Sequence, residues 1–412
     1  MKVLNIINSL GDSGQYFIPL FEGLIDRGHH LFVISPSVSP LMQTKLARIG
    51  ITYVSLGRIR RGLSSLLGLV RFPFVLRKMM RVISSENIDL IHVHNGFGPL
   101  LLGCIVSSLK KIPLVLMIHG GRPSFSFRLN PIYQAHSIIS TSLEQKEALP
   151  AKCKEVKVIP LPINLTRFFP NSSVGKTGKL DPQISLFNSG SPSPVVYNLI
   201  EAAPKISKEF QNAKIVIAGW YSGYFELANI IRKMNEEIGR EMIILAGFVE
   251  DTPSVMNQAD IVIGVGVVVA EAMACGRPVI VARTQFGGIV DEHNVAELRR
   301  YNFTGRNSTT PTDAQNLFVS INALLGDERY MKRLGEFGRR YAEEEFEPNK
   351  IASQVELVYK RAQENVKNPS RFTLPFLVGW KILPAMLYIF VKEVFMLKIS
   401  KVITFLSKPF AR

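Results

Sequence analysis

The feature that most constrains the fold is a twice-repeated alternation of short, continuous apolar runs with amphipathic helical segments. The first series begins with KVLNIIN, passes through a glycine-bearing loop and a helix to HLFVISP, and continues through DLIHVHNGFG, PLVLMIHGG and VKVIPLP. Continuous apolar strands with helices between them are typical of a parallel sheet that is covered on both faces. Residues 1–170 therefore predict one doubly wound α/β domain.

The same pattern starts again after a polar stretch. Residues 171–183 read NSSVGKTGKLDPQ, which predicts a linker; it lacks the spacing and the preceding strand of a phosphate loop. Beyond it, ISLFNSG, AKIVIAGW, MIILAGFV, ADIVIGVG and PVIVAR alternate with helical segments. Residues 184–365 therefore predict a second doubly wound domain, closed by the charged helical segment at 334–363. Two such facing domains would form a cleft at the carboxyl ends of their strands.

The composition fits a two-domain globular protein with an anionic partner. A chain of 412 residues exceeds one ordinary core, and a hydrophobic fraction of 47% is globular rather than disordered. The 49 Lys and Arg residues against 33 Asp and Glu residues give a formal net charge of +16, which favours nucleic acid, a membrane surface or a phosphate-bearing ligand. The three cysteines form no CxxC pair, and the N-terminal apolar run is too short for a signal peptide, so we expect a reduced cytoplasmic protein.

The strongest functional signal is IVIGVGVVVAEAMACGRPVIV, residues 261–281. It predicts a strand, a glycine loop, a short helix and a strand, with Glu271 where the loop becomes the helix. The start of a helix offers unpaired N–H groups to a phosphate, and Gly264 and Gly266 would let the backbone approach it. A carboxylate on the first turn can accept hydrogen bonds from ribose hydroxyls. The plain alternative is a glutamate that only favours the helix dipole, beside glycines that only form a tight turn.

The second half resembles the donor domain of family-four retaining glycosyltransferases of the GT-B fold, through GFVEDTPSVMNQADIVI followed by EAMACGRPVIV. The first half follows the same family in order: INSLGDSGQ is similar to its N-terminal glycine loop, DLIHVHNGFGPLLLG and IPLVLMIHGG to its middle strands, and VKVIPLPINLTRFFP to the segment before the interdomain crossing. The resemblance covers roughly residues 1–365. It implies two facing Rossmann-like domains, a nucleotide-sugar donor, and neither a metal nor another cofactor.

The resemblance also implies roles for individual residues. Glu271 would bind the ribose of the donor, and main-chain groups of Gly247, Phe248 and Val249 would contact its base. RTQFGGIVDE places Gly287–Gly288 where the family has a loop near the donor, with a simple turn as the alternative. The residues expected to bind the donor nucleotide are Gly11, Gly14, Gly247, Phe248, Val249, Gly264, Gly266, Glu271 and Ala272. The loop of Gly11 and Gly14 lacks a complete G-x-G-x-x-G, so the acceptor or the donor phosphate is its expected partner.

His119 is expected, with Glu271, to be a catalytic residue. It follows a buried strand in MIHGG, at the carboxyl edge of the first sheet, and the matching histidine of the family approaches the donor sugar. We expect it to position the sugar rather than act as a general base, because retaining chemistry needs no protein nucleophile if the acceptor attacks the leaving-group face. An ordinary structural histidine is the alternative. His92 and His94 have no carboxylate or cysteine beside them, so they do not predict a metal site.

Two departures from the family pattern count against ordinary activity. Ile263 stands eight residues before Glu271, where family members commonly have a second glutamate that touches the donor sugar. FNSGSPSPVVYN has no cation where the family usually has an arginine and a lysine that neutralise the leaving diphosphate. Loss of such a clamp would cost several powers of ten in rate. Arg277, Arg283 and Arg306 are the candidate substitutes.

Two basic apolar segments indicate a membrane surface. Arg58 to Arg81 carries seven basic residues and no acid, typical of a helix that lies on anionic lipid; an ordinary surface helix packed on the sheet is the alternative. Residues 366–412 carry eight Lys and Arg residues against Glu393 alone. Within them Lys381 and Pro384 interrupt an apolar stretch of minimal spanning length. We therefore expect an in-plane or monotopic anchor rather than a span, with an oligomer interface as the alternative.

Together these features predict a glycosyltransferase that moves a sugar from a nucleotide-sugar donor to a lipid-linked or cell-surface polysaccharide acceptor. It would be cytoplasmic and peripheral or monotopic at the inner face of the cell membrane. The leading alternative, favoured by Ile263 and the missing cations, is a degenerate homologue that acts as a non-enzymatic partner subunit. A nucleotide-sugar epimerase of similar fold is a weaker third interpretation. Nucleic acid is not expected as a partner, because the basic stretches are interleaved with aliphatic residues and no nucleic-acid-binding module is recognisable.

Overall fold

The computed structural model divides the chain into two compact units. The described residues are 1–55, 66–120, 131–151, 153, 155–171, 181–188, 190–219 and 222–367. Unit 1 comprises the described residues of Met1–Thr141, Gln145–Ile159 and Ala352–Arg412, and unit 2 those of Ser142–Glu144 and Pro160–Ile351. Each unit holds one sheet with helices on both faces, so the predicted class of two Rossmann-like α/β domains is confirmed.

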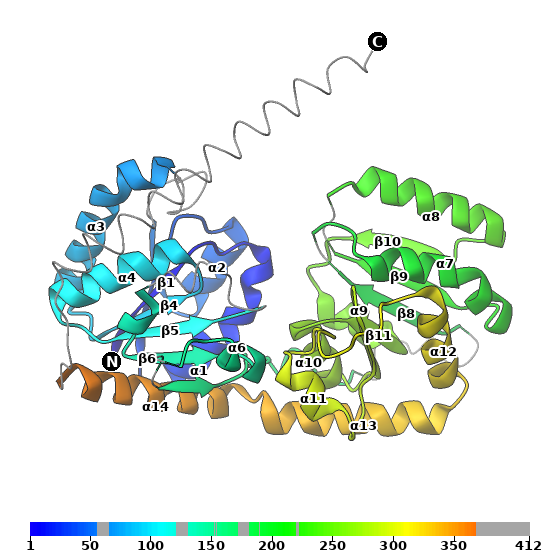
Figure 1. Ribbon diagram of the computed structural model, residues 1–412. Helices are drawn as coiled ribbons and strands as arrows, with labels where there is room; N and C mark the ends of the chain where they lie inside the picture. Colours follow the sequence, from blue (N-terminus) through cyan, green and yellow to red (C-terminus); the bar gives the residue numbers. More distant parts are fainter. Residues whose placement is uncertain are drawn as a thin grey trace, which may run out of the picture. The chain divides into compact units, whose positions relative to one another are not determined.

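Unit 1 is built on a parallel sheet. Its strands are β1 (Lys2–Ile7), β2 (His30–Ser35), β3 (Thr52–Ser55), β4 (Leu90–His94), β5 (Leu114–Ile118), β6 (Ser137–Ser140) and β7 (Val156–Val158). The helices along this part of the chain are η1 (Asp12–Phe17), α1 (Ile18–Asp26), α2 (Pro40–Arg48), α3 (Leu66–Glu86), α4 (Phe97–Lys110), η2 (Pro131–Gln134) and α6 (Leu143–Glu147). Among the described residues the strand order is β3-β2-β1-β4-β5-β6-β7. Figure 1 shows α3 and α4 on one side of this sheet and α1 on the other.

Unit 2 is built on a mostly parallel sheet. Its strands are β8 (Gln183–Phe187), β9 (Lys214–Ala218), β10 (Ile243–Gly247), β11 (Ile261–Gly264), β12 (Val279–Ala282) and β13 (Phe286–Ile289). Its helices are α7 (Pro194–Glu209), α8 (Tyr224–Ile238), α9 (Thr252–Gln258), α10 (Val267–Ala274), α11 (Val295–Arg300), α12 (Ala314–Leu325) and α13 (Glu328–Glu345). The strand order among the described residues is β10-β9-β8-β11-β12-β13. Buried side chains of α7, α8 and α12 cover one face, and those of α9 and α10 cover the other.

The last strand of unit 2 corrects the interpretation of RTQFGGIVDE. Gly287 and Gly288 lie inside β13, which pairs antiparallel with β12, and form neither a donor loop nor a simple turn. A Cβ at Gly287 would lie 2.8 Å from Cγ1 of Val281, which is closer than real side chains approach. A glycine is therefore needed here so that β13 can lie against β12.

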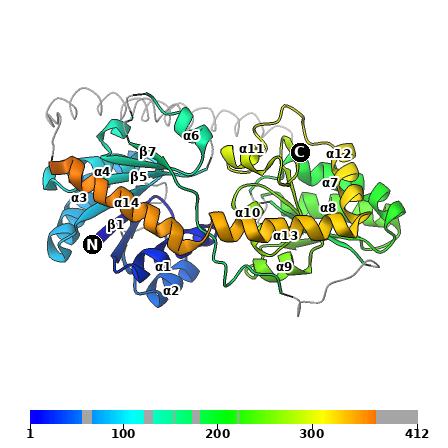
Figure 2. The same ribbon diagram turned by 90° about the horizontal axis from the view of Figure 1, so that it is seen from below.

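The final helix is α14 (Pro348–Lys367), which belongs to unit 1 from Ala352 on, although the sequence placed residues up to 365 in the second domain. Its Tyr359 is fully buried and its hydroxyl lies 2.7 Å from Nδ1 of His92 on β4. Nε of Arg27 donates to Glu356 at 2.6 Å, and Nδ2 of Asn365 donates to the His136 carbonyl at 3.0 Å. Figure 2 shows α14 lying along the unit 1 sheet.

The described part of the basic segment Arg58–Arg81 is a helix packed on the sheet. Val75, Met79 and Ile83 of α3 recur every four residues and are buried against the unit 1 core. Phe74 is 75% exposed and the neighbouring cations are exposed as well. This part of α3 therefore fits the ordinary surface helix, and its outward face remains basic.

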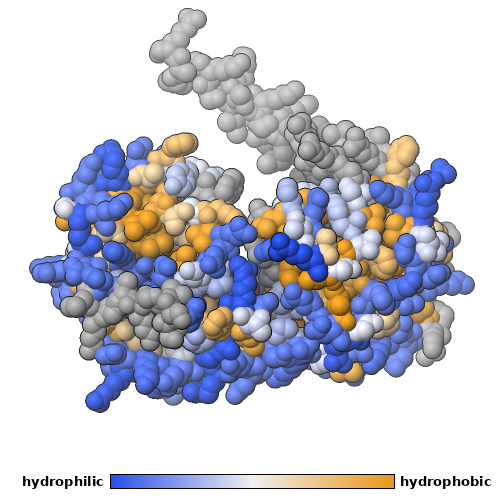
Figure 3. All heavy atoms as spheres, turned by 180° about the vertical axis from the view of Figure 1, so that it is seen from behind, coloured by the Kyte–Doolittle hydropathy of each residue, from blue (hydrophilic) through white to orange (hydrophobic). Residues whose placement is uncertain are grey.

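The rest of the predicted membrane segments lies outside the description. Residues 56–65 and 368–412 are not described, and of residues 66–73 only the backbone is. No helix within the described ranges combines the length and apolar content needed to cross a membrane. On the face drawn in Figure 3, hydrophilic side chains predominate and hydrophobic ones gather in patches between them. Membrane association stays a prediction.

Candidate functional site

Side-chain caps separate two groups of helices in unit 2. Asp251, Asp313 and Asp327 accept hydrogen bonds from the first-turn amides of α9, α12 and α13. In contrast, α7, α8, α10 and α11 have no side-chain cap, and of these α7, α8 and α10 follow parallel strands of the sheet. In α7 the N–H of Val195 already donates to a backbone carbonyl, that of Arg283, at 2.9 Å. An uncapped helix start leaves backbone N–H groups without partners, which suits an anionic ligand. These open starts lie at the carboxyl edge of the sheet, where α/β proteins bind ligands.

Two glycines shape the loop between β11 and α10. A Cβ at Gly264 would lie 2.6 Å from Cγ1 of Val268, so no larger residue fits there. Gly266, the residue before the helix, has a φ of +67° and nothing within 4 Å of where its Cβ would be. Its own N–H donates to the Phe303 carbonyl at 2.9 Å. The prediction that the Gly266 amide meets a diphosphate is therefore not supported, and the first amides of α10, from Val267, take that place.

Glu271 lies in the second turn of α10, not on the first as predicted. The helix begins at Val267 because the chain reverses at Gly266, so three valines and an alanine precede the glutamate. Its side chain is partly exposed, yet burial raises the pKa of the carboxyl group to about 8, while Arg167 acts to lower it. Ala272 is fully buried in the core of unit 2, so its side chain offers nothing to a ligand.

Arg167 belongs to this region, and the sequence interpretation missed it. It lies in the turn after Asn164, where its N–H donates to Oδ1 of that residue at 2.9 Å. Its Nη2 donates to the Glu250 carbonyl at 2.9 Å, and its charge acts on Glu271. One cation therefore connects the helix that carries Glu271 with the loop that follows β10. Only the position of TRFFP, just before the linker, could have signalled it.

The predicted base-binding residues end the edge strand β10. Gly247 has a φ of +66°, and its carbonyl accepts from the Gly219 N–H at 2.7 Å. Phe248 is 52% exposed, whereas Val249 is partly buried against the core of unit 2. The ring of Tyr224 lies 3.8 Å from where a Cβ of Gly247 would be. Two aromatic side chains therefore lie near the end of this strand, and aromatic rings are suited to stacking on a planar base.

The three arginines that could replace the missing family cations lie at different places in the unit 2 fold. Arg277 precedes β12 at the amino edge, where it lines a cavity of about 740 Å³. Arg283 follows β12 at the carboxyl edge, and its carbonyl accepts from the N–H of Val195 in the first turn of α7 at 2.9 Å. Arg306 is paired with Glu144 at 2.5 Å. Of the three, Arg283 is the exposed cation at the correct edge, and its guanidinium has no partner among the described residues.

Two further residues define the central strands at this edge. Ile263 is fully buried in the core, in register with Leu186 and Ile280, so its position supplies nothing to a ligand. Asn188, the first residue after β8, accepts from the Ser193 hydroxyl at 3.3 Å. Its buried Nδ2 has no hydrogen-bond partner within the described ranges. A buried donor with unused capacity is costly unless a ligand uses it.

In unit 1, the structure brings His119 and the predicted glycine loop together. His119 directly follows β5, and the side chain of Asn95 both donates to its carbonyl at 2.8 Å and accepts from its N–H at 3.3 Å. The N–H of Gly14 donates to the Gly11 carbonyl at 2.8 Å, which starts η1. At the end of η1 the ring of Phe17 lies edge-on to His119, with centroids 5.2 Å apart.

His119 is electrically neutral in this setting. Burial lowers the pKa of His119 to about 3. An imidazole with so low a pKa is a poor general base at neutral pH, which supports the expected positioning role.

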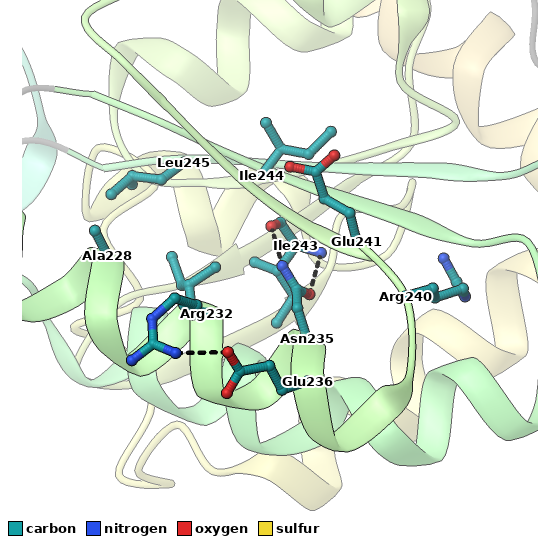
Figure 4. A pocket seen from close by; sticks show the side chains of 10 residues that line it. Ala228, Arg232, Asn235, Glu236, Arg240, Glu241, Ile243, Ile244 and Leu245 are labelled. Carbon is teal, nitrogen blue, oxygen red and sulfur yellow. Dashed lines mark hydrogen bonds and ion pairs between the residues drawn. The ribbon is translucent and has the colours of Figure 1, made fainter.

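A pocket at the outer edge of unit 2 is not the predicted site. It has a volume of about 500 Å³ and lies between α8 and the start of β10. Figure 4 shows Arg232 paired with Glu236, 2.5 Å apart, and Asn235 hydrogen-bonded to the backbone of Ile243. None of the predicted site residues lines it. Within the described part of the chain no group of three His, Cys, Asp or Glu residues could hold a metal ion, and metal independence stays a prediction.

Comparison with known protein families identifies two matching family models. The family model for Glycosyltransferase Family 4 matches residues 13–167, and that for Glycosyl transferases group 1 matches residues 192–327. The chain belongs to glycosyltransferase family 4 and has the GT-B fold. The predicted family and the predicted transferase enzyme are thus confirmed.

Individual relatives of this family-4 glycosyltransferase span nearly its whole described length. N-acetyl-alpha-D-glucosaminyl L-malate synthase from Bacillus anthracis is 23% identical over 395 residues, which are 87% of this chain and 96% of the relative. The crystal structure of Anabaena HepE in complex with UDP and glucose matches with a TM-score of 0.68 at 20% identity, over 87% of this chain and 99% of that one. A glycosyltransferase from Rickettsia africae matches with a TM-score of 0.67 at 17% identity, over 89% of this chain and 99% of that one.

Proposed function

We propose that this family-4 glycosyltransferase moves a sugar, with retention of configuration, from a UDP-linked donor to a lipid-linked or cell-surface polysaccharide acceptor. The observation that carries the proposal is the carboxyl edge of unit 2. It combines the uncapped start of α10, the carboxyl group of Glu271, and Arg167 close to both Glu271 and the loop after β10. The crystal structures of HepE with UDP and with UDP-glucose support UDP as the nucleotide.

Each part of the donor has a proposed partner. The amides at the start of α10 bind the diphosphate, and Glu271 binds the ribose hydroxyls. The backbone from Gly247 to Val249 meets the base beside exposed aromatic rings. Arg283 takes the place of the missing family cations, because it is the exposed arginine next to the start of α7 at the carboxyl edge. His119 positions the sugar.

The chemistry follows from these partners. A hydroxyl oxygen of the acceptor bonds to the anomeric carbon, while the bond from that carbon to the UDP oxygen breaks on the same face. The acceptor proton passes to the leaving diphosphate, so no protein nucleophile or general base is required. The charge that develops on the diphosphate is stabilised by the amides of α10 and by Arg283, which is where electrostatic catalysis has most effect.

The acceptor class rests on the distribution of charge. The chain has a formal net charge of +16, and α3 presents Phe74, Arg77, Lys78 and Arg81 to solvent. Cations beside an exposed aromatic ring suit the surface of an anionic membrane, where lipid-linked acceptors lie. A small hydroxy acid is the second candidate acceptor, favoured by the B. anthracis relative, whose name specifies L-malate.

Binding and turnover of a panel of UDP-sugars test the proposal. We expect calorimetry to show UDP binding that Glu271→Gln weakens at least tenfold, because one oxygen acceptor of the carboxyl group is replaced by an amide nitrogen that cannot accept a hydrogen bond. Glu236→Gln is the matched control: it removes the charge of a helical glutamate in the separate pocket of Figure 4 and should leave binding unchanged. Absence of binding to every UDP compound would refute the proposal.

The acceptor is tested separately with the identified donor. We expect transfer to a polyprenyl-diphosphate-linked sugar in anionic vesicles. Transfer to L-malate in the absence of vesicles would replace the lipid-linked acceptor with the small-molecule alternative and leave the donor assignment intact.

A further inference from the structure

The cavity of about 740 Å³ in unit 2 lies at the amino edge of the sheet, opposite the edge of the proposed donor site. Pro182, Asp260 and Pro278 line it, and they are the residues immediately before β8, β11 and β12. These three strands are parallel, so their first residues meet at one edge. Every residue that lines this amino-edge cavity belongs to unit 2. A ligand bound there would be additional to a nucleotide at the carboxyl edge.

Part of the lining of the amino-edge cavity is apolar. Phe210 follows α7, Leu325 ends α12 and Met331 lies near the start of α13. All three side chains are partly buried and pack against the core of unit 2. The apolar part of a ligand that lay on them would be removed from water, which favours binding.

Arg277 is a cation of the same lining, and its hydrogen-bonding capacity is largely unused. Its Nη2 donates to Oδ1 of Asn257 at 3.4 Å, a long bond to an atom that also accepts from the Asn171 N–H at 3.0 Å. Its Nε is buried and has no hydrogen-bond partner among the described residues. Burial lowers the pKa of Arg277 and Asp260 acts to raise it, but an arginine stays protonated in proteins. A planar guanidinium with unused donors is suited to a phosphate or a carboxylate.

Arg339, another arginine of this lining, has a structural role that Arg277 lacks. Its Nη1 donates to the carbonyl of Ala274 at 2.8 Å and to that of Phe168 at 3.0 Å, and its Nε donates to Glu343 at 2.6 Å. Ala274 is the last residue of α10, so Arg339 satisfies the end of that helix. The plain explanation for a cation at this edge, that it caps a helix, therefore accounts for Arg339 and not for Arg277.

The acidic residues of the lining have other roles in the fold. Oδ2 of Asp260 accepts from the first backbone N–H of β8 at 2.8 Å. Oε1 of Glu336 lies 3.9 Å from Nζ of Lys332. Glu328 is exposed in the first turn of α13, where a carboxylate favours the helix dipole. An anionic ligand would therefore be the direct partner of Arg277.

Close backbone contacts form the wall beside Arg277. A Cβ at Gly335, in α13, would overlap the carbonyl oxygen of Gly276. A Cβ at Gly338, one turn later, would lie 3.3 Å from Cα of Met273 in α10. Figure 2 shows α13 lying beside α10. Two glycines thus allow these elements to touch, and because packed backbone shapes the cavity, little ordering is needed when a ligand binds.

We propose that the amino-edge cavity is a second ligand site, which binds a small amphiphilic anion: an organic phosphate or carboxylate with an apolar body. The oxygens of the anionic group accept hydrogen bonds from the guanidinium of Arg277, and the apolar body lies on Phe210, Leu325 and Met331. Arg340, exposed on the same lining, adds a second positive charge. This site is separate from the donor edge and does not rest on the proposed function.

A series of probes tests the ligand class on the wild-type protein. Calorimetry should show that octyl phosphate, below its micelle concentration, binds at least tenfold more tightly than octanol, which lacks the charge, and than inorganic phosphate, which lacks the chain. Affinity should fall about fourfold for each methylene removed from the chain. Comparison with octanoate identifies the preferred anionic group. Octanol that bound as tightly as octyl phosphate, an affinity independent of chain length, or no binding of either anion would overturn the proposal.

Two arginine variants test the role of Arg277. Arg277→Gln should weaken the binding of octyl phosphate about tenfold, because a charged hydrogen-bond donor is lost. Arg333→Gln is the matched control: it removes a charge from α13 at a residue that pairs with Glu292, 3.6 Å away, and does not line the cavity. Melting curves show whether each variant is folded. Equal affinity in the wild type and in folded Arg277→Gln would refute the contact.

The position of the ligand is measured without a charge variant. In the whole protein labelled with ¹³C at its methionine methyl groups, octyl phosphate should shift the NMR signal of Met331, which Met331→Leu identifies. Saturating UDP should not displace the probe. A Met331 signal that does not move, or displacement by UDP, would place the probe elsewhere and overturn the proposal. Failure of UDP to bind would count against the proposed function and not against this site.

Discussion

The carboxyl edges of the two sheets use opposite kinds of chemistry. In unit 1 the polar groups at this edge are neutral, buried and already hydrogen-bonded to one another, from Asn5 through His94 to His119. In unit 2 they are ionisable or unpaired: the open start of α10, Glu271, Arg167 and the exposed Arg283. The edge of unit 1 is therefore neutral, whereas that of unit 2 suits an anionic ligand.

This difference implies that the two edges should respond to mutation and to pH in opposite ways. The neutral groups of unit 1 depend on geometry and on desolvation, so their disruption affects the packing of that unit. A charged edge depends on opposite charges, so its disruption affects stabilisation of the leaving diphosphate. A substitution at one edge should therefore leave the properties of the other edge unchanged.

The largest expected effect is on turnover in Arg283→Ala. When an enzyme loses one fixed group that stabilises negative charge in the transition state, kcat typically falls about 100-fold. We expect this loss with little change in KM, measured as UDP release with the identified acceptor. Arg277→Ala is the control, because Arg277 lies at the amino edge of the same sheet. Equal losses in both variants would show that net charge, not position, matters.

The second prediction concerns the stability of unit 2 and Glu271. Burial raises the pKa of this carboxyl group from 4.5 to about 8. The protonated form therefore favours the folded state: its contribution is complete below pH 4.5 and is lost as the pH rises to about 8. Glu271→Gln should consequently raise the melting temperature of the ligand-free protein, by an amount that grows between pH 5 and 8. A melting temperature that is lower than wild type at pH 8 would contradict the raised pKa.

The third prediction gives unit 1 the opposite slope. Burial lowers the pKa values of His92 and His119 from 6.5 to about 3. Neutral histidine therefore favours the folded state: its contribution is complete above pH 6.5 and is lost as the pH falls towards 3. Hydrogen-exchange mass spectrometry should show protection of β4 and β5 declining below pH 6.5. Protection that is constant down to pH 4 would mean that these rings accept protons without cost.

A smaller effect is expected from Tyr359→Phe. The substitution removes the hydroxyl 2.7 Å from Nδ1 of His92 and leaves that buried nitrogen without its partner. The cost should be about 1–3 kcal/mol in the free energy of unfolding, measured with urea. Exchange should quicken in α14 and β4 but not in β11. Equal changes in both units would show that α14 stabilises the whole chain rather than unit 1.

The sequence predicted what depends on local patterns. Two sheets, most of their strands and their family followed from apolar periodicity and from EAMACGRPV, whereas the edge strands β3 and β13 were not predicted. It did not predict the packing of α14, because an amphipathic helix does not reveal which sheet its apolar face covers. The helical turn that holds Glu271 depends on the backbone of Gly266. The hydrogen bonds that join Asn5, His94 and His119 were not predicted either, because these residues meet only when β1, β4 and β5 become neighbours in the sheet.

The smallest effect should come from cations that belong to neither edge. Arg77 and Arg81 lie on the exposed face of α3, while Val75 and Met79 hold this helix on the sheet. A lysine or arginine near an anionic membrane contributes about 1 kcal/mol, so Arg77→Ala should weaken binding to phosphatidylserine vesicles roughly fivefold. Affinity for UDP should not change, because α3 lies in unit 1, whereas the charged edge is in unit 2. If Arg77→Ala lowered the affinity for vesicles and for UDP, the positive surface of α3 would attract the donor as well. The effect of charge would then be long-range and not confined to the edge of unit 2.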